Sequence, residues 1–429
     1  MSPPGRSGKI SESYNKKTIM KAINKLKSAN ALRQKEGSLF LMITALQRME
    51  MKRRRKSSKK KTRIGFMAKY DDILRADWSS KIYKPKPKKT KQPHKVNWVM
   101  SPPGKGLGGG HQNIFRFIYY LESQGYDCRI YLYNDRMYQD PNAAKAVYRQ
   151  AYPDSKADVE LLDGPMRSAD AAFATGWETA YPVFNDPGDA VKLYFVQDFE
   201  PYFHPMGSEY ILAENTYRMN LHGITAGGWL DKKLSTEYGM PCDHYDFGTD
   251  TNLYRFENEE QRKEVFFYAR PVTARRGFEL GVMALQIFHQ KMPDYTINLA
   301  GWDVSEYELP FPYKNLKSMP LSELSDLYNR CAAALVISLT NMSLLPLELL
   351  SSGVVPVINS GENNKLVSNN PFIVYTDPSP AALADSLIEV VERKDLPKQA
   401  KAAAESVKEL SWDRSCKQFQ TILERHING

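Results

Sequence analysis

The stretch that decides the fold is Ala333–Ile358, which reads AALVISLTNMSLLPLELLSSGVVPVI. An apolar run ends in Ser338–Thr340, a polar turn follows, and an apolar helical stretch leads through Gly353 into a second, β-branched run. Apolar runs separated by a helix are typical of the parallel sheet of an α/β protein. The Thr340–Leu345 turn offers backbone N–H groups to an anion. Glu348 is the one charge in the stretch, and ribose hydroxyls are suitable donors for it.

The same alternation extends in both directions from this stretch. Apolar runs predict strands at 96–101, 128–134, 171–175, 191–196, 223–226 and 244–247, and a second series at 264–268, 296–300, 333–337 and 354–358. Helical patterns lie at 277–290, 321–330, 347–352, 380–393 and 397–410. We therefore predict two successive α/β domains, 96–255 and 256–411, that meet near 251–261.

The charge of the chain is divided unevenly. Lys and Arg total 59 against 49 Asp and Glu in 429 residues, a net charge of +10. Residues 1–95 hold 28 of the basic and only 6 of the acidic residues, so they carry +22 and the remainder carries −12. This split predicts a basic N-terminal extension joined to an acidic globular body.

Composition excludes several classes of protein. Hydrophobic residues at 42% and aromatic residues at 11% exclude a wholly disordered chain. The four cysteines are far apart and form no disulfide or metal-ligand pattern. No apolar run reaches the roughly 20 residues that span a bilayer, and the first residues lack a signal-peptide core. We expect a cytoplasmic protein.

The first strand of the body runs into a glycine-rich loop. Pro103–His111 has five glycines in nine residues before a helix. Glycines let the backbone approach a ligand closely, and the helix start can hold an anion. The spacing matches neither a P-loop nor GxGxxG, so a simple tight turn stays open as the alternative. His111 is either a polar contact or proton carrier, or a structural hydrogen-bonding residue.

Two more strands end in charged side chains. Gln197, Asp198 and Glu200 follow the run 191–196, and ligands of open α/β sheets bind at the carboxyl ends of strands. The carboxylates could bind hydroxyls or take a proton; capping the next segment is the equal alternative.

Arg270, Arg275 and Arg276 follow the run 264–268. Three guanidiniums there fit the oxygens of a diphosphate; a solvated charge cluster is the other interpretation.

With these motifs in place, residues 96–425 resemble the retaining GT-B glycosyltransferases of glycosyltransferase family 4. The landmarks, in chain order, are GGGH at 108–111, FGTD at 247–250, Arg270 with Arg276–Gly277, Leu324–Ala334, and Pro346–Glu348 followed by SSGVVPVI. The resemblance implies an α/β fold of two Rossmann-like, doubly wound domains that face a cleft, with residues 412–429 crossing back to complete the first.

The resemblance also implies a site and a reaction. The donor nucleotide sugar would contact Gly109, Gly110, Arg275, Gly301, Met319, Ser338, Thr340, Asn341, Ser343, Leu344, Leu345 and Glu348. Gln197 and Glu200 would bind the acceptor, and Asp198, His111, Arg270 and Arg276 would act in catalysis. Arginines and backbone amides would stabilise the departing diphosphate, so no metal or other cofactor is expected.

One departure concerns the sugar. The family has a glutamate eight positions before Glu348, where this chain has Thr340, so donor-sugar recognition does not carry over. The combination of QDFEPYF (197–203) with LTNMSLLPLE (339–348) resembles bacterial rhamnosyltransferases of S-layer glycan assembly. The resemblance implies transfer of L-rhamnose from dTDP-rhamnose, with retention of configuration, to a lipid-linked oligosaccharide.

The positive charge of residues 1–95 fits two kinds of partner, nucleic acid and an anionic membrane surface. Their charge fits nucleic acid, but the cluster lacks interleaved aromatic residues, so we expect an anionic membrane surface at the inner face of the cell membrane and no nucleic-acid partner. A solvated tail is the alternative for these residues. For the whole chain, the alternative functions are a nucleic-acid-binding protein that uses the basic region and a GT-B nucleotide-sugar epimerase, and a homodimer is left open.

Overall fold

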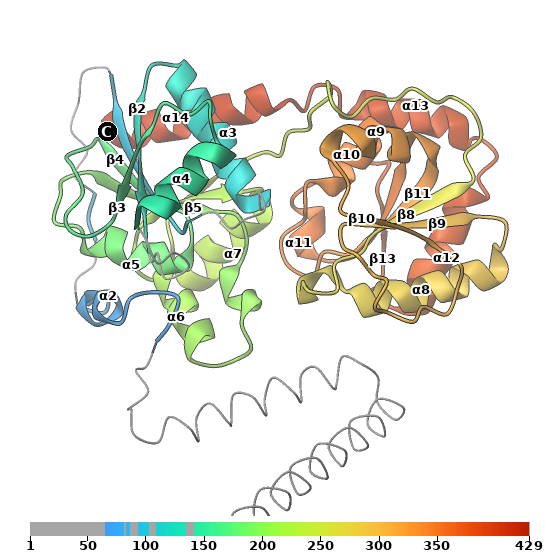
Figure 1. Cartoon of the computed structure of the whole chain (residues 1–429), viewed down its shortest axis with the longest axis horizontal. Coiled ribbons are helices and arrows are strands. Elements are labelled where there is room, and N and C mark those ends of the chain that lie inside the picture. Colours follow the sequence, from blue (N-terminus) through green and yellow to red (C-terminus); the bar gives the residue numbers. More distant parts are fainter. Residues whose placement is uncertain (1–64, 81–82, 86–92, 103–108, 134–140, 429) are drawn as a thin grey trace, which may run out of the picture. The chain divides into compact units, whose positions relative to one another are not determined.

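The structure is a computed structural model that describes residues 65–80, 83–85, 93–102, 109–133 and 141–428 (Figure 1). Residues 66–429 form one compact unit. Residues 1–64, the greater part of the predicted basic extension, lie outside the described residues. Most of the glycine-rich loop, residues 103–108, also lies outside them.

The first sheet consists of seven parallel strands in the order β3-β2-β1-β4-β5-β6-β7. The strands are β1 Lys95–Met100, β2 Asp127–Leu132, β3 Asp158–Leu161, β4 Ala171–Ala174, β5 Val191–Val196, β6 His222–Ala226 and β7 Cys242–Tyr245. Strands β4 and β5 are buried along their whole length, and β1 is buried from its second residue on. Burial on both faces explains why they read as continuous apolar runs in the sequence.

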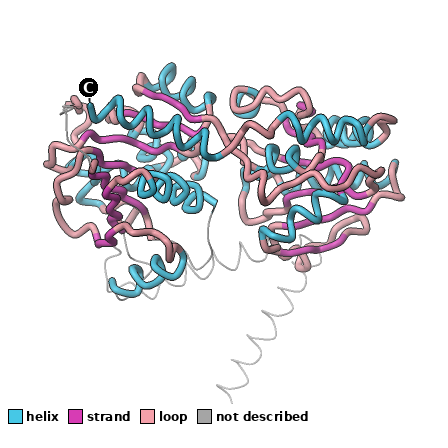
Figure 2. The backbone as a smooth tube through the Cα atoms, turned by 90° about the horizontal axis from the view of Figure 1, so that it is seen from above, coloured by secondary structure: helices cyan, strands magenta, loops and turns pink. Residues whose placement is uncertain are grey.

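Helices pack on both faces of this sheet (Figures 1 and 2). They are α2 Tyr70–Arg75, α3 Gly109–Ser123, α4 Pro141–Ala151, α5 Trp177–Asn185, α6 Ser208–Thr216, α7 Gly228–Tyr238 and the last helix, α14 Trp412–Asn428; a 3-10 turn, η1 Glu200–Phe203, follows β5. α2 packs against α5, and Asp72 accepts a hydrogen bond from the Tyr133 hydroxyl at 2.7 Å. Part of the segment that we predicted as an extension therefore packs on the first sheet.

The second sheet has six parallel strands in the order β10-β9-β8-β11-β12-β13. They are β8 Glu264–Tyr268, β9 Thr296–Ala300, β10 Lys314–Lys317, β11 Cys331–Val336, β12 Val355–Asn359 and β13 Val374–Thr376. The helices are α8 Phe278–Lys291, α9 Leu321–Arg330, α10 Leu345–Ser351, α11 Glu362–Lys365, α12 Pro380–Val391 and α13 Leu396–Ser406, with a 3-10 turn, η2 Ala274–Arg276. α8 and α12 pack together on one face, and α10 and α13 pack together on the other (Figure 1).

Two chain segments connect the sheets, and they pair with each other. The Thr249 N–H donates to the Leu410 carbonyl at 2.7 Å, and Thr249 forms a bridge with Ser411. A Cβ on Gly248 would lie 2.7 Å from the Trp412 nitrogen, so only glycine allows this approach. α14 then packs on α3 and β7, where the Phe419 ring stacks 5.5 Å from Phe173. The chain therefore ends on the first sheet.

The predicted strands and helices are present within a few residues of their expected bounds. The run predicted at 244–247 corresponds to β7, which begins and ends two residues earlier. Strands β3, β10 and β13 were not predicted, and each lies at the edge of its sheet. Edge strands are short and often polar, and β10 reads KNLK. Met319, one of the predicted donor contacts, lies in the loop after β10.

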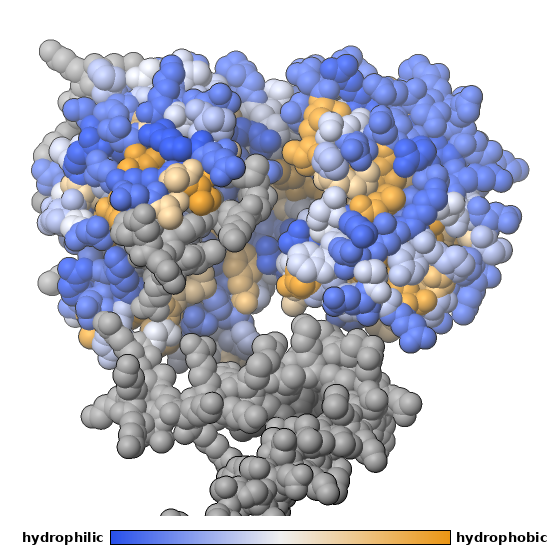
Figure 3. Space-filling model, viewed as in Figure 1, coloured by the Kyte–Doolittle hydropathy of each residue, from blue (hydrophilic) through white to orange (hydrophobic). Residues whose placement is uncertain are grey.

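The described surface is mainly hydrophilic in the view of Figure 3, with smaller apolar patches between the polar regions. Among the described residues, no helix is both long and apolar enough to cross a bilayer.

Candidate active site at the carboxyl ends of the two sheets

The carboxyl ends of β5 and β11 meet at Asp198. The Thr340 hydroxyl donates to Asp198 Oδ2 at 2.8 Å, and the Asn341 N–H donates to Asp198 Oδ1 at 2.9 Å. These bonds join residues that are more than 140 positions apart in the chain. The turn after β11 is therefore held against Asp198, which follows β5 by two residues.

Asn341 strengthens this junction. Its side-chain Nδ2 donates to the Gln197 carbonyl at 3.0 Å and to the Ala226 carbonyl at 2.8 Å. Asn341 is buried, and its Oδ1 has no hydrogen-bond partner among the described residues. A buried amide oxygen without a donor is costly, so a ligand that supplies one would be favoured here.

Groups around Asp198 have opposing effects on its pKa, and the net effect is a raised pKa. Burial raises the pKa of this carboxyl, while the bonds from Asn341 and Thr340 and the charges of Arg275 and Arg276 oppose the rise. Arg275 Nε lies 3.6 Å from Asp198 Oδ2. The guanidinium of Arg275 also lies over the Phe203 ring, 4.4 Å from its centre. A carboxylate held in this way can accept a hydrogen bond from a substrate hydroxyl.

The two other arginines lie beside the same turn. Arg276 Nη1 donates to the Ser338 hydroxyl at 2.8 Å. Burial lowers the pKa of Arg276, and the neighbouring cations Arg275 and Arg270 lower it further. Arg270 lies near the Gly301 carbonyl, with Nη1 3.5 Å from the oxygen, and over the Trp302 ring at 5.7 Å. One carboxylate against three guanidiniums leaves a net positive site, which favours an anion.

Asparagines at the end of β12 and just after it donate hydrogen bonds to the turn. The Ser338 carbonyl accepts hydrogen bonds from the side chains of Asn359, Asn363 and Asn364 at 3.0, 2.8 and 3.1 Å. Asn359 Oδ1 in turn accepts from the Ser338 N–H at 2.7 Å. Sequence analysis missed these residues, although they follow the predicted strand 354–358, where site residues of α/β sheets are expected.

The start of α3 reaches the same region from the first sheet. Gln197 Nε2 donates to the Gly110 carbonyl at 3.2 Å, and Asn113 Nδ2 donates to Gln197 Oε1 at 3.0 Å. His111 Nε2 lies 2.9 Å from the Ser101 carbonyl, so it donates there in this structure. That bond agrees with the second of the two roles predicted for His111, that of a structural hydrogen-bonding residue.

Asn113 was not predicted as a site residue. Its position three residues after Gly110 is the feature of the sequence that could have pointed to it.

Glu348 has no hydrogen-bond or ion-pair partner for its carboxylate among the described residues. Burial raises the pKa of Glu348 to about 7, against a partial opposing effect of Arg116. Arg116 itself lies over the Trp412 ring at 3.8 Å. The lone carboxylate predicted from the sequence is thus present, half-buried and without a donor.

Glu200 does not join the other predicted residues. It is buried, it accepts from the Trp177 N–H and from the Tyr194 hydroxyl, and burial and Glu178 raise its pKa. Both carboxylate oxygens are occupied by the protein, so Glu200 has a structural role; it binds the start of the earlier helix α5 and does not cap the next segment. Of the remaining residues, Gly109 begins α3, Met319 and Ser343 are half-buried in loops, and Leu344 and Leu345 begin α10.

Comparison with solved structures identifies the fold. A mutant of S. aureus TarM in complex with fondaparinux, alpha-GlcNAc-glycerol and UDP matches with a TM-score of 0.59 and 9% identity, over 77% of this chain and 99% of that one. WaaG, a glycosyltransferase involved in lipopolysaccharide biosynthesis, matches with a TM-score of 0.50 and 12% identity over 78% and 100%. The two sheets therefore form a GT-B fold, which confirms the predicted fold class.

Two matches in sequence are more specific. Residues 263–388 match the family model of the WsaF C-terminal domain. The arginines, the Ser338–Asn341 turn and Glu348 all lie within this range. The O-antigen biosynthesis protein RfbC of Myxococcus xanthus is 30% identical over 331 residues, 74% of this chain. The chain spans 26% of the length of RfbC.

Proposed function

We propose that this chain is a glycosyltransferase of bacterial surface-glycan biosynthesis that uses a nucleotide diphosphate sugar as donor. The observation that carries the proposal is the junction at Asp198, where one carboxylate from the first sheet meets Arg275, Arg276 and the Thr340–Asn341 turn of the second. Concentrated guanidiniums bind a diphosphate, and the carboxylate beside them can bind an acceptor hydroxyl.

Three kinds of similarity support this reading. The TarM structure of the same fold holds UDP, RfbC is an O-antigen biosynthesis protein, and the WsaF C-terminal domain model covers the arginines and Glu348. Since the structural matches are below 25% identity, they support the fold, and the activity rests on the site and on the sequence matches.

We assign the roles as follows. Arg270, Arg275 and Arg276 hold the diphosphate and stabilise the charge that develops as it departs. Glu348 accepts hydrogen bonds from the ribose hydroxyls. The bond from the sugar C1 to the phosphate oxygen breaks, the bond from C1 to the acceptor oxygen forms on the same face, and the acceptor proton passes to the departing phosphate. Asp198 orients the acceptor hydroxyl and needs no net proton change.

The donor we propose is dTDP-L-rhamnose, transferred with retention of configuration. Thr340 supports the choice. It stands where the family has a glutamate that could hydrogen-bond to a fully hydroxylated sugar, and its own hydroxyl is already bound to Asp198. We propose no metal or other cofactor for this step, since the arginines supply the positive charge. The acceptor is a lipid-linked oligosaccharide, and residues 1–95 hold the enzyme at the anionic inner face of the cell membrane through their charge of +22.

A thermal-shift panel tests the donor proposal. dTDP, UDP, GDP and ADP, each alone and as a nucleotide sugar, are compared at equal concentration, because a ligand that binds only the folded state raises the melting temperature. We expect dTDP and dTDP-rhamnose to give the largest rise. No rise with any nucleotide would contradict the proposed function.

The membrane proposal needs a truncation that respects the structure. Removal of residues 1–64 keeps α2, which packs on α5, and should abolish sedimentation with anionic vesicles while activity on a soluble acceptor is kept. Vesicle binding that survives this truncation would contradict the role given to the basic residues.

A further inference from the structure

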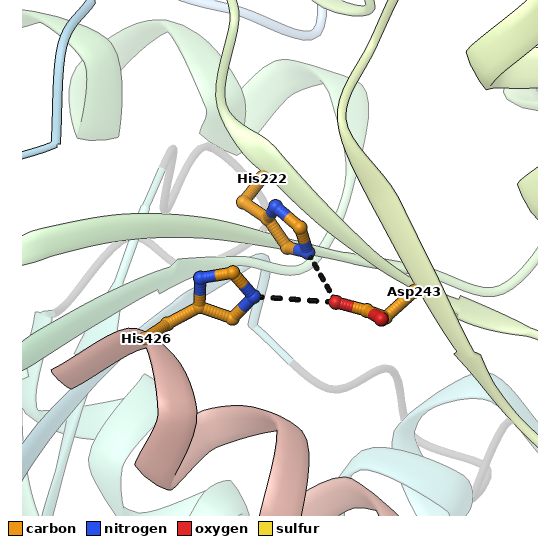
Figure 4. Close-up of side chains that lie close together, drawn as sticks. All are labelled: His222, Asp243 and His426. Atoms are coloured by element: carbon orange, nitrogen blue, oxygen red, sulfur yellow. Dashed lines mark hydrogen bonds and ion pairs between the residues drawn. The ribbon is translucent and has the colours of Figure 1, made fainter. Parts of the chain in front are cut away.

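Three side chains of types that can bind metal ions, two histidines and an aspartate, meet at the opposite, amino-terminal end of the first sheet. His222 begins β6, Asp243 lies in β7, and His426 lies in the last turn of α14. His222 Nε2 lies 2.8 Å and His426 Nε2 lies 3.2 Å from Asp243 Oδ2. Figure 4 shows that both rings point one nitrogen at the same carboxylate oxygen. All three side chains are half-buried.

The three atoms lie close enough together for one cation to reach them after the side chains adjust. Zn²⁺ binds imidazole nitrogen and carboxylate oxygen at about 2.0–2.2 Å, which places neighbouring ligands about 3.3 Å apart in tetrahedral geometry. Here the three candidate ligand atoms lie within 4.8 Å of one another. The ring centres of His222 and His426 lie 3.7 Å apart, so the two rings must turn away from each other for one cation to contact all three atoms. Two imidazoles with one carboxylate are also a donor set that Zn²⁺ takes in proteins.

The surroundings leave these atoms available. Arg425 binds the other oxygen of Asp243, with Nη2 2.9 Å from Oδ1, and so fixes the carboxylate while Oδ2 stays directed at the rings. The Arg425 side chain is 57% exposed, so water screens its repulsion of a cation. A pocket of about 390 Å³ lined by Asp243 and Arg425 lies beside the cluster and gives access to water.

A hydrogen-bonded cluster without metal is the competing explanation. In that arrangement both rings donate an Nε2 proton to one oxygen, and their centres lie 3.7 Å apart. Zn²⁺ would replace these two donations with three bonds to the metal, while each neutral ring carries its proton on Nδ1. Proton count and charge on the rings do not change, so no co-reactant is needed.

We propose that His222, Asp243 and His426 form a Zn²⁺ site that fastens the last helix to the edge of the first sheet. The ligands come from two neighbouring strands and from the helix that returns after the second sheet. A metal held by all three must stabilise the docking of that helix. The site lies at the other ends of the strands from Asp198, so it is separate from the proposed transfer reaction and does not depend on it.

Sequence spacing could not reveal this site. The ligands are 21 and 183 residues apart, far outside the spacing of recognised zinc motifs. Only the return of α14 to the first sheet brings His426 to the others.

The test uses the full chain without an affinity tag, freed of metal by a chelator, and titrated with ZnCl₂ in a calorimeter. His222→Gln and His426→Gln keep an amide that can donate to Asp243 but lack the ligand nitrogen. We expect one Zn²⁺ per chain, an affinity at least about tenfold lower in either variant, and a Zn²⁺-dependent rise in melting temperature that both variants lose.

Controls separate the site from other histidines. His244 follows Asp243 in β7, and its Nδ1 lies 2.7 Å from Asp231 Oδ2. His244→Gln should leave Zn²⁺ binding unchanged. Co²⁺ added to the metal-free wild type should give the visible absorption of a four-coordinate ion, and His426→Gln should abolish it. Absence of Zn²⁺ binding in the folded wild type, equal binding in His222→Gln and His426→Gln, or loss of binding in His244→Gln would each overturn the proposal.

Discussion

The carboxyl ends of the two sheets are built from different chemistry. The second sheet presents three arginines, a small-polar turn and a set of supporting asparagines. The first sheet presents one carboxylate, Asp198, backed by Gln197 and Asn113. The family model of the WsaF C-terminal domain covers only the second set.

This difference separates two tasks. Guanidiniums and amides suit the diphosphate that donors of this kind share, and a recognisable family domain is expected where the ligand is shared. A single carboxylate suits an acceptor hydroxyl, and acceptors vary from one glycan to the next. We infer that substitutions in the second sheet act on the donor and that substitutions at Asp198 act on transfer.

The largest effect is expected at Arg276. Arg276→Ala removes the guanidinium bound to Ser338 and should lower kcat with dTDP-rhamnose about 10²–10³-fold, the usual cost of losing a group that stabilises a developing anion. Steady-state kinetics measure it. Arg330→Ala, which removes an exposed arginine of α9, is the control and should keep full activity. Equal activity in both variants would contradict the diphosphate site.

A smaller loss is expected at Asp198. Asp198→Asn keeps the shape but removes the charge, and should lower kcat about 10–100-fold while the dissociation constant of dTDP stays within about twofold. Kinetics with calorimetry separate the two quantities. Weakened dTDP binding at unchanged kcat would reverse the division of tasks. Glu200→Gln is the contrast: it should lower the melting temperature, because Glu200 holds Trp177 and Tyr194.

Glu348 should show opposite effects on binding and stability. Burial raises its pKa from 4.5 to about 7, so the stability linked to its protonation is present below about pH 4.5 and is lost as the pH rises through about 7. Glu348→Gln should therefore be more stable than wild type by about 1–3 kcal/mol at pH 8, and nearly equal at pH 4.5. Denaturant unfolding at the two pH values measures this.

The same variant should bind dTDP about tenfold more weakly, because an amide oxygen is a weaker acceptor for ribose hydroxyls than a carboxylate. If Glu348→Gln is more stable but binds dTDP with unchanged affinity, Glu348 is a buried charge that takes no part in binding, and its assigned contact with the ribose is wrong.

The smallest effect is expected at Thr340. Thr340→Val removes one hydrogen bond to Asp198 and should lower kcat about threefold to tenfold. Thr340→Ser keeps the hydroxyl and should restore most of the activity. If the serine and valine variants are equally impaired, the bond to Asp198 has no role in turnover.

Much of this architecture could be predicted from the sequence, for a physical reason. Buried parallel strands read as continuous apolar runs, and glycines and arginines at strand ends mark turns and anion sites. The edge strand β10 has a polar sequence and could not be predicted in this way. The roles of Asp198 and Glu200 could not be separated either, because only the fold shows that Glu200 is directed inward to Tyr194.

The hydrogen bonds between residues far apart in the chain could not be predicted from the sequence either. Nothing in the sequence pairs Asn341 with Gln197 and Ala226, or brings Asn363 behind Ser338. These bonds depend on how two sheets and their loops meet, which periodicity along one chain does not encode.

The most direct test of the central claim is a calorimetric titration of dTDP into the wild type and into Arg276→Ala. The proposed site predicts one dTDP bound per wild-type chain and an affinity at least about tenfold lower in the variant. No binding to the folded wild type, or equal affinity in the two proteins, would contradict the claim that the arginines of the second sheet hold a nucleotide diphosphate.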